Sequence, residues 1–406
     1  MRGILLGFSL VCGLHAAVVA HVGQFVQGTT AVTDVGFRPQ VLLFFSTLQT
    51  ADGSAADFQI GIGMATSSTA RVAEWTTVTN ADSTAKRRAI TTGAIVIDNT
   101  AQTTVGQADL VSMDARGFTL SWSVNDSTAR IIKYVALAGF TAVKVGTWST
   151  CNSATGNLAV TGVGFQPDAL IPMLFTSAPG AGANSDFALA FITAAAQMAV
   201  AGQTANAGVS NRRERALAWE LFFSSSGNLY NEATFTSFDV DGFTINDATC
   251  AGSSLTAVYL ALKGGSIAVG TTTQPTSNGS VSVTGLGFKP SVVLLMGDET
   301  ATSVVTVANQ RFAIGAATSS TSRWAQAAGR TSSANNASVN VDSAKVIEFI
   351  TENGATPVVV SAADLTSMDV GGFTLNWTTT DATARLVAYL AIGPAPSGAV
   401  RHRVTQ

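Results

Sequence analysis

The sequence predicts an all-β protein made of three tandem antiparallel β-sandwich domains, jelly-roll-like, of about 125 residues each. Three observations lead to this prediction. A segment of constant length occurs three times, at Gly117–Gly139, Gly242–Gly264 and Gly372–Pro394. Apolar and polar residues alternate along much of the chain, and turn residues recur every dozen or so positions. No amphipathic helix pattern longer than two turns appears in the 406 residues.

The repeated segment has the pattern of a β-hairpin. In the third copy, Phe373, Leu375 and Trp377 alternate with polar residues, which is typical of a strand with one buried face. After a polar turn, the chain returns through Leu386–Ile392, which is apolar at both parities. Such a return strand is expected at the centre of a sheet that is covered on both faces.

Each repeat opens with two expected strands, a polar turn and a Gly-Phe-x-Pro motif before an aliphatic strand. Proline fixes φ and lacks an N–H donor, so we expect it just before a strand. Glycine before the phenylalanine permits a tight bend. The three motifs begin at Gly36, Gly164 and Gly287 and end at Pro39, Pro167 and Pro290.

The middle of each repeat is expected to hold further strands. Asp57–Trp75 matches Arg311–Gly329 closely, whereas the second repeat departs from this pattern. The segment Arg215–Phe223 is rich in helix-forming residues. Its alternating apolar residues favour a strand instead.

These repeats divide the chain into five parts: an apolar segment at 1–20, sandwich repeats at 21–139, 140–264 and 265–393, and a tail at 394–406. The first segment resembles a secretory signal, with Arg2, an apolar stretch and small residues before His21. It also fits an arm that packs on the fold or on a neighbouring subunit. It is too short and too interrupted for a membrane span.

Composition excludes some functions. Charged residues make up 12% of the chain and the net charge is −3, without a basic stripe, so nucleic-acid binding is not expected. Beside Cys12, the chain has only Cys151 and Cys250, both in the second repeat. These two either form one disulfide or remain two free thiols in turns.

The sequence predicts neither an enzyme nor a cofactor or metal site. The three histidines, His15, His21 and His402, lie near the termini. This placement leaves the repeats without the usual general base and metal ligand. Nucleophile-elbow, phosphate-loop and calcium-loop motifs are not found either.

Aspartates recur at matched positions and precede strands in Asp/Gly-rich turns: Asp109, Asp114, Asp239, Asp364 and Asp369. We expect them to form turns rather than a glycosidase pair. Two Asp/Arg pairs flank the hairpin turns of the first and third repeats, Asp126/Arg130 and Asp381/Arg385. We interpret them as salt bridges that close the turns rather than as recognition pairs.

The candidate binding residues are Arg71 with Trp75, and Arg323 with Trp324, which follow near-identical ATSSTAR and ATSSTSR segments. A tryptophan beside a guanidinium at a strand end suits a surface that stacks on a sugar ring or grips a partner. The alternative is that these tryptophans close a sandwich core. Trp122 and Trp377 lie on the apolar phase of their strands and are expected in the core.

The segments VTGVGFQPDALI and GFTLNWTTTDATAR resemble repeats of uncharacterised virion and tail-associated proteins of tailed bacteriophages. The resemblance spans nearly all of Val22–Gly393 and implies a β-scaffold without a named active residue. The back half is more distantly similar to H-type lectin domains. That family consists of small β-sandwiches that bind sugars such as N-acetylgalactosamine as trimers, and here tyrosine stands where the family usually has tryptophan.

We therefore expect a non-enzymatic virion structural protein, either a capsid decoration or a tail or fibre component. Its partners would be other virion proteins or copies of itself. The alternative is a lectin-like adhesin, secreted or virion-borne, that binds host-surface glycan. A glycan-active enzyme built on carboxylates is a third and weaker hypothesis.

Overall fold

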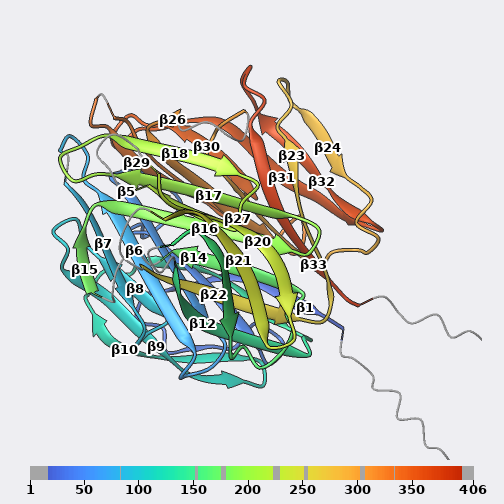
Figure 1. Ribbon diagram of the computed structural model, residues 1–406. Helices are drawn as coiled ribbons and strands as arrows, with labels where there is room; N and C mark the ends of the chain where they lie inside the picture. The colour runs from blue at the N-terminus through green and yellow to red at the C-terminus, as the bar shows by residue number, and fades with distance from the viewer. Residues whose placement is uncertain are drawn as a thin grey trace, which may run out of the picture.

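The computed structural model describes residues 17–82, 84–150, 154–174, 180–222, 229–250, 255–301, 307–332 and 334–395. Over these residues the chain forms strands β1 to β33 and no helix, so the predicted all-β class is confirmed. Figure 1 shows the strands from blue at the N-terminus to red at the C-terminus.

The first repeat holds these strands: β1 Val19–Val26, β2 Ala31–Val32, β3 Val41–Ser46, β4 Gly53–Ala56, β5 Phe58–Ala65, β6 Arg71–Val78, β7 Ala85–Ile90, β8 Ile95–Asp98, β9 Thr104–Asp114, β10 Gly117–Asn125 and β11 Ile131–Ala138. The second repeat follows the same order: β12 Ala142–Thr150, β13 Gly156–Thr161, β14 Ala169–Leu174, β15 Gly180–Ala183, β16 Ser185–Thr193, β17 Gln197–Thr204, β18 Ser210–Arg215, β19 Trp219–Phe222, β20 Leu229–Asp239, β21 Gly242–Cys250 and β22 Leu255–Lys263. The third repeat completes the chain: β23 Ser266–Thr273, β24 Gly279–Val283, β25 Val292–Gly297, β26 Val307–Ala308, β27 Gln310–Ala317, β28 Arg323–Arg330, β29 Ala337–Asp342, β30 Ile347–Thr351, β31 Val358–Asp369, β32 Gly372–Thr379 and β33 Leu386–Gly393.

Each repeat builds one large sheet and one four-stranded sheet. In the first repeat, the large sheet runs β1-β11-β3-β5-β6-β7 and the small sheet runs β2-β10-β9-β8. The strands of these sheets pair antiparallel, and the other two repeats have the same order. The closing strand β11 lies inside the large sheet, between β1 and β3, as predicted for a return strand that is apolar on both faces.

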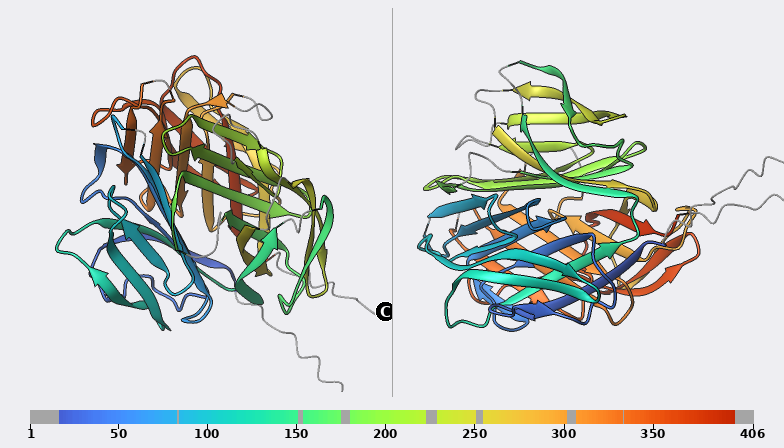
Figure 2. Two further views of the ribbon diagram at one scale, coloured as in Figure 1. Left: turned by 60° about the vertical axis from the view of Figure 1, so that its left-hand side comes forward. Right: turned by 90° about the horizontal axis from the view of Figure 1, so that it is seen from below.

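A seventh strand in each large sheet comes from another repeat. Strand β15 of the second repeat pairs with β7 of the first, and β26 of the third pairs with β18 of the second. Strand β4 of the first repeat pairs with β29 of the third. The exchange therefore closes a ring in which every repeat both gives and receives one strand. Figures 1 and 2 show the three repeats packed against one another in this arrangement.

The apolar core consists of one cluster shared by the repeats and one inner cluster in each repeat. Alternate residues of a central strand point into one or the other. In β3, Val41, Leu43 and Phe45 point into an apolar cluster shared by all three repeats, whereas Leu42 and Phe44 point into the first sandwich. Each repeat has its own inner cluster between its two sheets. The shared cluster means that the repeats do not fold around three separate cores alone.

The chain passes from each exchanged strand back into the sheet of its own repeat through a single residue with positive φ. Asp57, Asn184 and Asn309 stand between the exchanged strand and the next strand of their own sheet, with φ of 75°, 70° and 74°. Asn and Asp tolerate this left-handed region better than other non-glycine residues. Their side chains also accept backbone N–H groups, from Asn80 to Asp57 for example, at 2.7 Å.

The fold begins inside the apolar segment predicted at 1–20. Val18 is 3% exposed within the shared core, and its carbonyl accepts a hydrogen bond from Ser291 Oγ of the third repeat at 2.9 Å. His21 lies in β1 and stacks on Tyr134, so it belongs to the first sandwich rather than to a terminal segment. Burial lowers the pKa of His21, which Asp34 partly opposes.

The turn glycines behave as expected. Gly36, Gly164 and Gly287 have φ of 87°, 91° and 77°, just before the aliphatic strands β3, β14 and β25. The strand predicted over Arg215–Phe223 is confirmed for Trp219–Phe222, which form β19. Arg215 is the last residue of β18, and a bend at 216–218 separates the two strands.

Candidate functional site

A groove of about 210 Å³ lies between the first and third repeats. One wall is β1, and the other consists of the turn before β28, the first two residues of β28 and Ser343 after β29. The lining residues are Val22, Gly23, Gln24, Thr321, Ser322, Arg323, Trp324 and Ser343. Hydroxyl, amide and guanidinium groups therefore face a small opening that two distant parts of the chain create.

Arg323 and Trp324, two of the four candidate binding residues, line this groove. Arg323 Nε donates to the carbonyl of Ala344 at 2.5 Å, and its Nη2 lies 3.5 Å from Asp364. Trp324 is only 1% exposed and packs against Phe45 of the first repeat, with ring centroids 4.9 Å apart. The prediction that Trp324 offers its ring at the surface is therefore wrong, because the ring fills the shared core.

The other predicted pair lies elsewhere and is also internal. Arg71 makes a bidentate contact with Asp109, with both N–O distances 2.7 Å. Trp75 is fully buried in the first sandwich, so the expectation of a surface ring is wrong here too. The alternative stated for these tryptophans, core closure, describes both. The physical reason is that the neighbouring four-stranded sheet and the neighbouring repeat cover both faces of the large sheet.

A buried lysine beside the groove was not singled out from the sequence. Lys133 is 1% exposed, and its Nζ lies 2.5 Å from Gln24 Oε1, 2.6 Å from Ser343 Oγ and 3.1 Å from Asp52 Oδ1. Burial lowers the pKa of Lys133, and the charge of Asp52 opposes this. A signal existed, since Lys133 is the single charged residue in the apolar return strand IIKYVALA.

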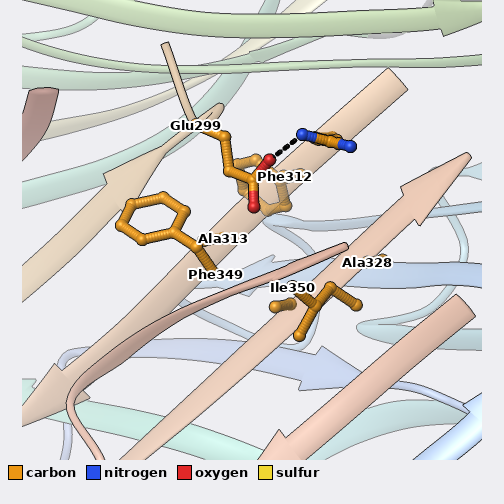
Figure 3. Close-up of a pocket in the computed structure, with 8 residues that line it drawn as sticks. Glu299, Phe312, Ala313, Ala328, Phe349 and Ile350 are labelled. Carbon is orange, nitrogen blue, oxygen red and sulfur yellow. Dashed lines mark hydrogen bonds and ion pairs between the residues drawn. The ribbon is translucent and has the colours of Figure 1, made fainter. Parts of the chain in front are cut away.

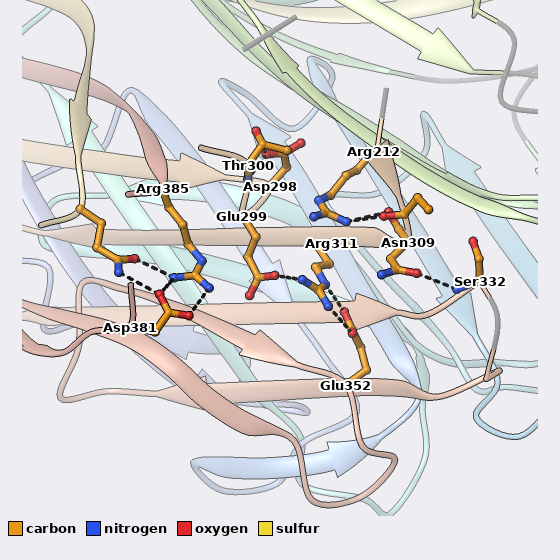
Figure 4. Close-up of polar contacts among 12 residues, drawn as sticks. Arg212, Asp298, Glu299, Thr300, Asn309, Arg311, Ser332, Glu352, Asp381 and Arg385 are labelled. Carbon is orange, nitrogen blue, oxygen red and sulfur yellow. Dashed lines mark hydrogen bonds and ion pairs between the residues drawn. The ribbon is translucent and has the colours of Figure 1, made fainter. Parts of the chain in front are cut away.

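A second group of charges lies where the second and third repeats meet (Figure 4). Arg212 of β18 donates to the carbonyl of Ala308 in the exchanged strand β26. Glu214 Oε2 accepts the backbone N–H of Asp298 at 3.3 Å, and both side chains are almost fully buried. Burial raises the pKa of both carboxyls.

Next to this group, Arg311 joins Glu299 and Glu352 (Figure 4). Glu352 receives two hydrogen bonds from Arg311, at 2.6 Å and 2.8 Å. Burial raises the pKa of Glu299 to about 7. A titrating carboxyl of this kind is a signal of acid–base chemistry only when a substrate can reach it.

The cavity beside Glu299 is too small for a substrate (Figure 3). It holds about 10 Å³ and is walled by Phe312, Ala313, Phe349 and Ile350. That volume accommodates about one water molecule. We therefore interpret the Arg311 cluster as part of the fold.

The first and second repeats meet around another buried arginine. Arg87 of β7 forms an ion pair with Asp186 of β16, which is fully buried. Burial raises the pKa of Asp186 to about 6 and that of Glu74, in the neighbouring strand β6, well above its ordinary value. Where the first repeat meets the second, and where the second meets the third, buried carboxyls thus surround an arginine. Burial favours the protonated form of these carboxyls.

Three of the five recurring aspartates stabilise the hairpins. Asp114 accepts Ser112 Oγ and Thr119 Oγ1, each at 2.7 Å, and Asp239 and Asp369 make matching contacts with Thr244 and Thr374. Asp364 instead lies 3.1 Å from Lys345. The interpretation as turn-forming residues therefore holds for Asp114, Asp239 and Asp369. It is wrong for Asp109 and Asp364, which lie inside β9 and β31 and form ion pairs with Arg71 and Lys345.

The two Asp/Arg pairs close their turns as predicted. Arg130 contacts both carboxylate oxygens of Asp126 at 2.6 Å and 3.0 Å, and Arg385 contacts both oxygens of Asp381 at 2.5 Å and 2.8 Å. Both arginines are buried. Each also donates a hydrogen bond to a glutamine, Gln27 or Gln274, near the end of the repeat's first strand.

Cys250 is disulfide-bonded. Cys151, its predicted partner, lies outside the described residues, directly after Thr150. Thr150 Oγ1 accepts a hydrogen bond at 3.0 Å from Asn231, the Cα partner of Cys250 across the sheet. Trp377 is 1% exposed in its sandwich core, and Trp122 packs against the first core.

Within the part of the chain that the structure describes, no group of three or more His, Cys, Asp or Glu residues could hold a metal ion. The same residues contain no helix long and apolar enough to cross a membrane.

Comparison with known proteins gives no family. No family model and no curated protein matches the chain. Two solved structures of a fructofuranosidase from Schwanniomyces occidentalis, complexed with fructose and with fructosyl-erythritol, are 8% identical to it. They cover 91% and 92% of this chain and 98% of their own, with TM-scores of 0.13 and 0.12. Similarity this low carries no argument about fold or function.

Proposed function

We propose that the protein is a non-enzymatic structural component of a bacteriophage virion, a capsid decoration or a tail or fibre protein, that acts through contacts with other subunits. The observation that carries this proposal is the closed strand exchange. It ties three repeats into one block and completes each large sheet with a seventh strand. A block of this kind suits a rigid structural subunit of an assembly.

Exposed apolar residues at hairpin tips suit such contacts. Val240 and Val370 are 84% and 97% exposed, and they occupy the same position in the β20–β21 and β31–β32 turns. Exposed valines in matched turns offer two similar contact points to neighbouring subunits. The resemblance of the repeats to virion and tail-associated proteins supports the same proposal.

The test is cosedimentation with virus particles. Antibodies against the purified chain would be used to locate it in density gradients of particles from cells that carry the gene. We expect a constant number of copies per particle, and fewer copies for the double variant Val240→Lys/Val370→Lys than for the control Val358→Lys. Protein found only in the particle-free fraction would overturn the proposal and favour secretion.

The groove beside Arg323 favours a second candidate function, carbohydrate binding as a secreted or virion-borne adhesin. Its volume and its mixture of hydroxyl, amide and guanidinium groups suit a small polyhydroxyl ligand. A glycan array of the full chain would test this. We expect binding that Arg323→Ala abolishes and Arg71→Ala, distant from the groove, preserves. A flat array would remove this candidate.

A further inference from the structure

Lys133 lies in an arrangement that suits bond formation as well as ion pairing. Its side chain is 2% exposed, and its three hydrogen-bond partners, Gln24, Asp52 and Ser343, come from three separate segments. Burial favours the neutral amine, which is the nucleophilic form of lysine.

Asp52 presents its carboxyl group to this amine. Oδ1 lies 3.1 Å from Lys133 Nζ, and Oδ2 accepts the backbone N–H of Ser343 at 2.8 Å. Asp52 directly precedes β4, which is held by pairing with β29 of the third repeat. The fixed backbone therefore holds Nζ in ion-pair contact with Oδ1, one covalent bond away from Cγ, which lowers the entropic cost of bringing the two groups together. The Asp52 side chain is 40% exposed, which leaves a departing water molecule a path to solvent.

A second carboxyl group, that of Glu348, interacts electrostatically with the pair. Glu348 of β30 is 1% exposed, and its Oε1 accepts a hydrogen bond from Asn340 Nδ2 at 2.7 Å. Burial raises its pKa to about 7, and it interacts electrostatically with both Asp52 and Lys133. Near neutral pH this group can both give and accept a proton.

We propose that Lys133 and Asp52 form an intramolecular isopeptide bond, with Glu348 as the proton carrier. In the ion pair, one ammonium proton passes to the Asp52 carboxylate. Burial of Asp52 favours this transfer, whereas hydrogen bonds from Ser343 and the charge of Lys133 lower the pKa of that carboxyl and oppose it. The neutral Nζ attacks Cγ, the C–N bond forms, and Glu348 transfers a proton from the nitrogen to the leaving hydroxyl. The C–O bond breaks and one water molecule leaves, so no oxidant, reductant or further reactant is needed.

The bond would tie β11 of the first repeat to the base of the exchanged strand β4, which completes the sheet of the third repeat. The ring would then be held covalently at the seam where its first and last repeats meet. The chain also contains a matched control. Lys345 Nζ lies at the same distance, 3.1 Å, from Asp364, but its side chain is 22% exposed, against 2% for that of Lys133.

Peptide mass spectrometry of the full chain, reduced and digested with trypsin, tests the proposal. We expect the Lys133 peptide, uncut at Lys133, joined to the Asp52 peptide with a loss of about 18 Da, one water. Asp52→Ala and Lys133→Arg should each give the separate peptides. Glu348→Gln should lower the linked fraction at least tenfold while circular dichroism shows an unchanged fold, and Lys345→Arg should leave it unchanged.

Wild-type protein that yields only separate peptides, with cleavage after Lys133, would overturn the proposal. A linked fraction that Glu348→Gln leaves unchanged would remove the role of Glu348. A linked Lys345–Asp364 peptide would show that proximity alone is sufficient and would overturn the argument from burial.

Discussion

At the scale of single residues, a glycine and a tyrosine face each other at the same point of every repeat. Gly23, Gly146 and Gly270 of the first strands are the Cα partners of Tyr134, Tyr259 and Tyr389 of the closing strands. A Cβ on these glycines would lie 2.6, 2.4 and 2.4 Å from the tyrosine Oη. The ring of each tyrosine therefore lies over the backbone of its glycine, which explains why both residues recur.

We expect Gly270→Ala to lower the free energy of unfolding by about 1–3 kcal/mol, the usual cost of overpacking. Tyr389 must move for the methyl group to fit, and its neighbours in the sandwich resist that movement. Urea unfolding measures the change. Thr271→Ala, exposed on the same strand, is the control, and an equal effect of the two substitutions would contradict the explanation.

Buried carboxyls also give the molecule a particular pH dependence. Burial raises the pKa of Glu220 to about 8, and Arg213 only partly opposes this. Between its ordinary value near 4.5 and about 8, the folded protein keeps a proton that the unfolded chain releases. Stability is therefore lost as pH rises through this window. Glu299 and Asp186 act in the same direction, over windows that end near 7 and 6.

We expect the free energy of unfolding to fall between about pH 5 and about pH 8, by at most about 1.4 kcal/mol per pH unit for each such group. Glu220→Gln should flatten the slope, because the amide does not titrate. Asp381→Asn should leave it unchanged, since the lowered pKa of Asp381, about 2, keeps that group ionised throughout. Urea unfolding at several pH values decides, and a stability that rises with pH would contradict the assignment.

At the scale of elements, the crossing residues decide whether strands can be exchanged. Asn309 has φ of 74°, and its Oδ1 accepts the N–H of Ser332 at 2.9 Å. It stands between β26, which extends the second repeat, and β27, which belongs to the third. The chain can leave the sheet of the second repeat and enter that of the third here because the backbone turns at a single residue.

Asn309→Ala is expected to cost about 1–2 kcal/mol of unfolding free energy, because alanine resists the left-handed region and loses the hydrogen bond. Asn309→Gly should cost less, since glycine adopts this conformation freely. Chemical denaturation of both variants measures the difference. Equal losses would show that the side-chain hydrogen bond, rather than the backbone conformation, matters at this crossing.

At the scale of the whole molecule, the shared apolar cluster couples the repeats. It contains Leu43 of the first repeat, Leu260 of the second and Leu390 of the third, each almost fully buried. Each large sheet also ends with a strand from another repeat. Unfolding one repeat alone would expose this cluster, open the edge of one neighbouring sheet and leave the strand donated by the other neighbour unpaired.

We therefore expect a single cooperative thermal transition, in which the calorimetric and van't Hoff enthalpies agree. Leu260→Ala should lower the free energy of unfolding by about 2–5 kcal/mol without splitting the transition. Ile245→Ala, inside the second sandwich alone, is the comparison. Three resolved transitions in the wild-type protein would contradict the coupling.

Much of the candidate site could not be read from the sequence, because its parts come from distant segments. Gln24 and Ser343 stand 319 positions apart and meet only through the closed ring. Trp75 and Trp324 follow a polar turn at a strand edge, a pattern that fits both a surface platform and a core residue. The local sequence pattern does not distinguish a surface tryptophan from a core tryptophan, because the residues that cover a sheet face belong to another segment of the chain.

The sequence by itself determined the all-β class, the threefold repetition, the central place of the closing strands and the turn-closing Asp/Arg pairs. These features depend on alternation and on contacts between neighbours in a hairpin, and both are local. Only the tertiary structure decided the exchange of β4, β15 and β26, the core shared by three repeats, and the burial of Lys133 beside Asp52. These features depend on which sheet edges and faces meet across hundreds of residues, and side-chain pattern within one segment does not encode that choice.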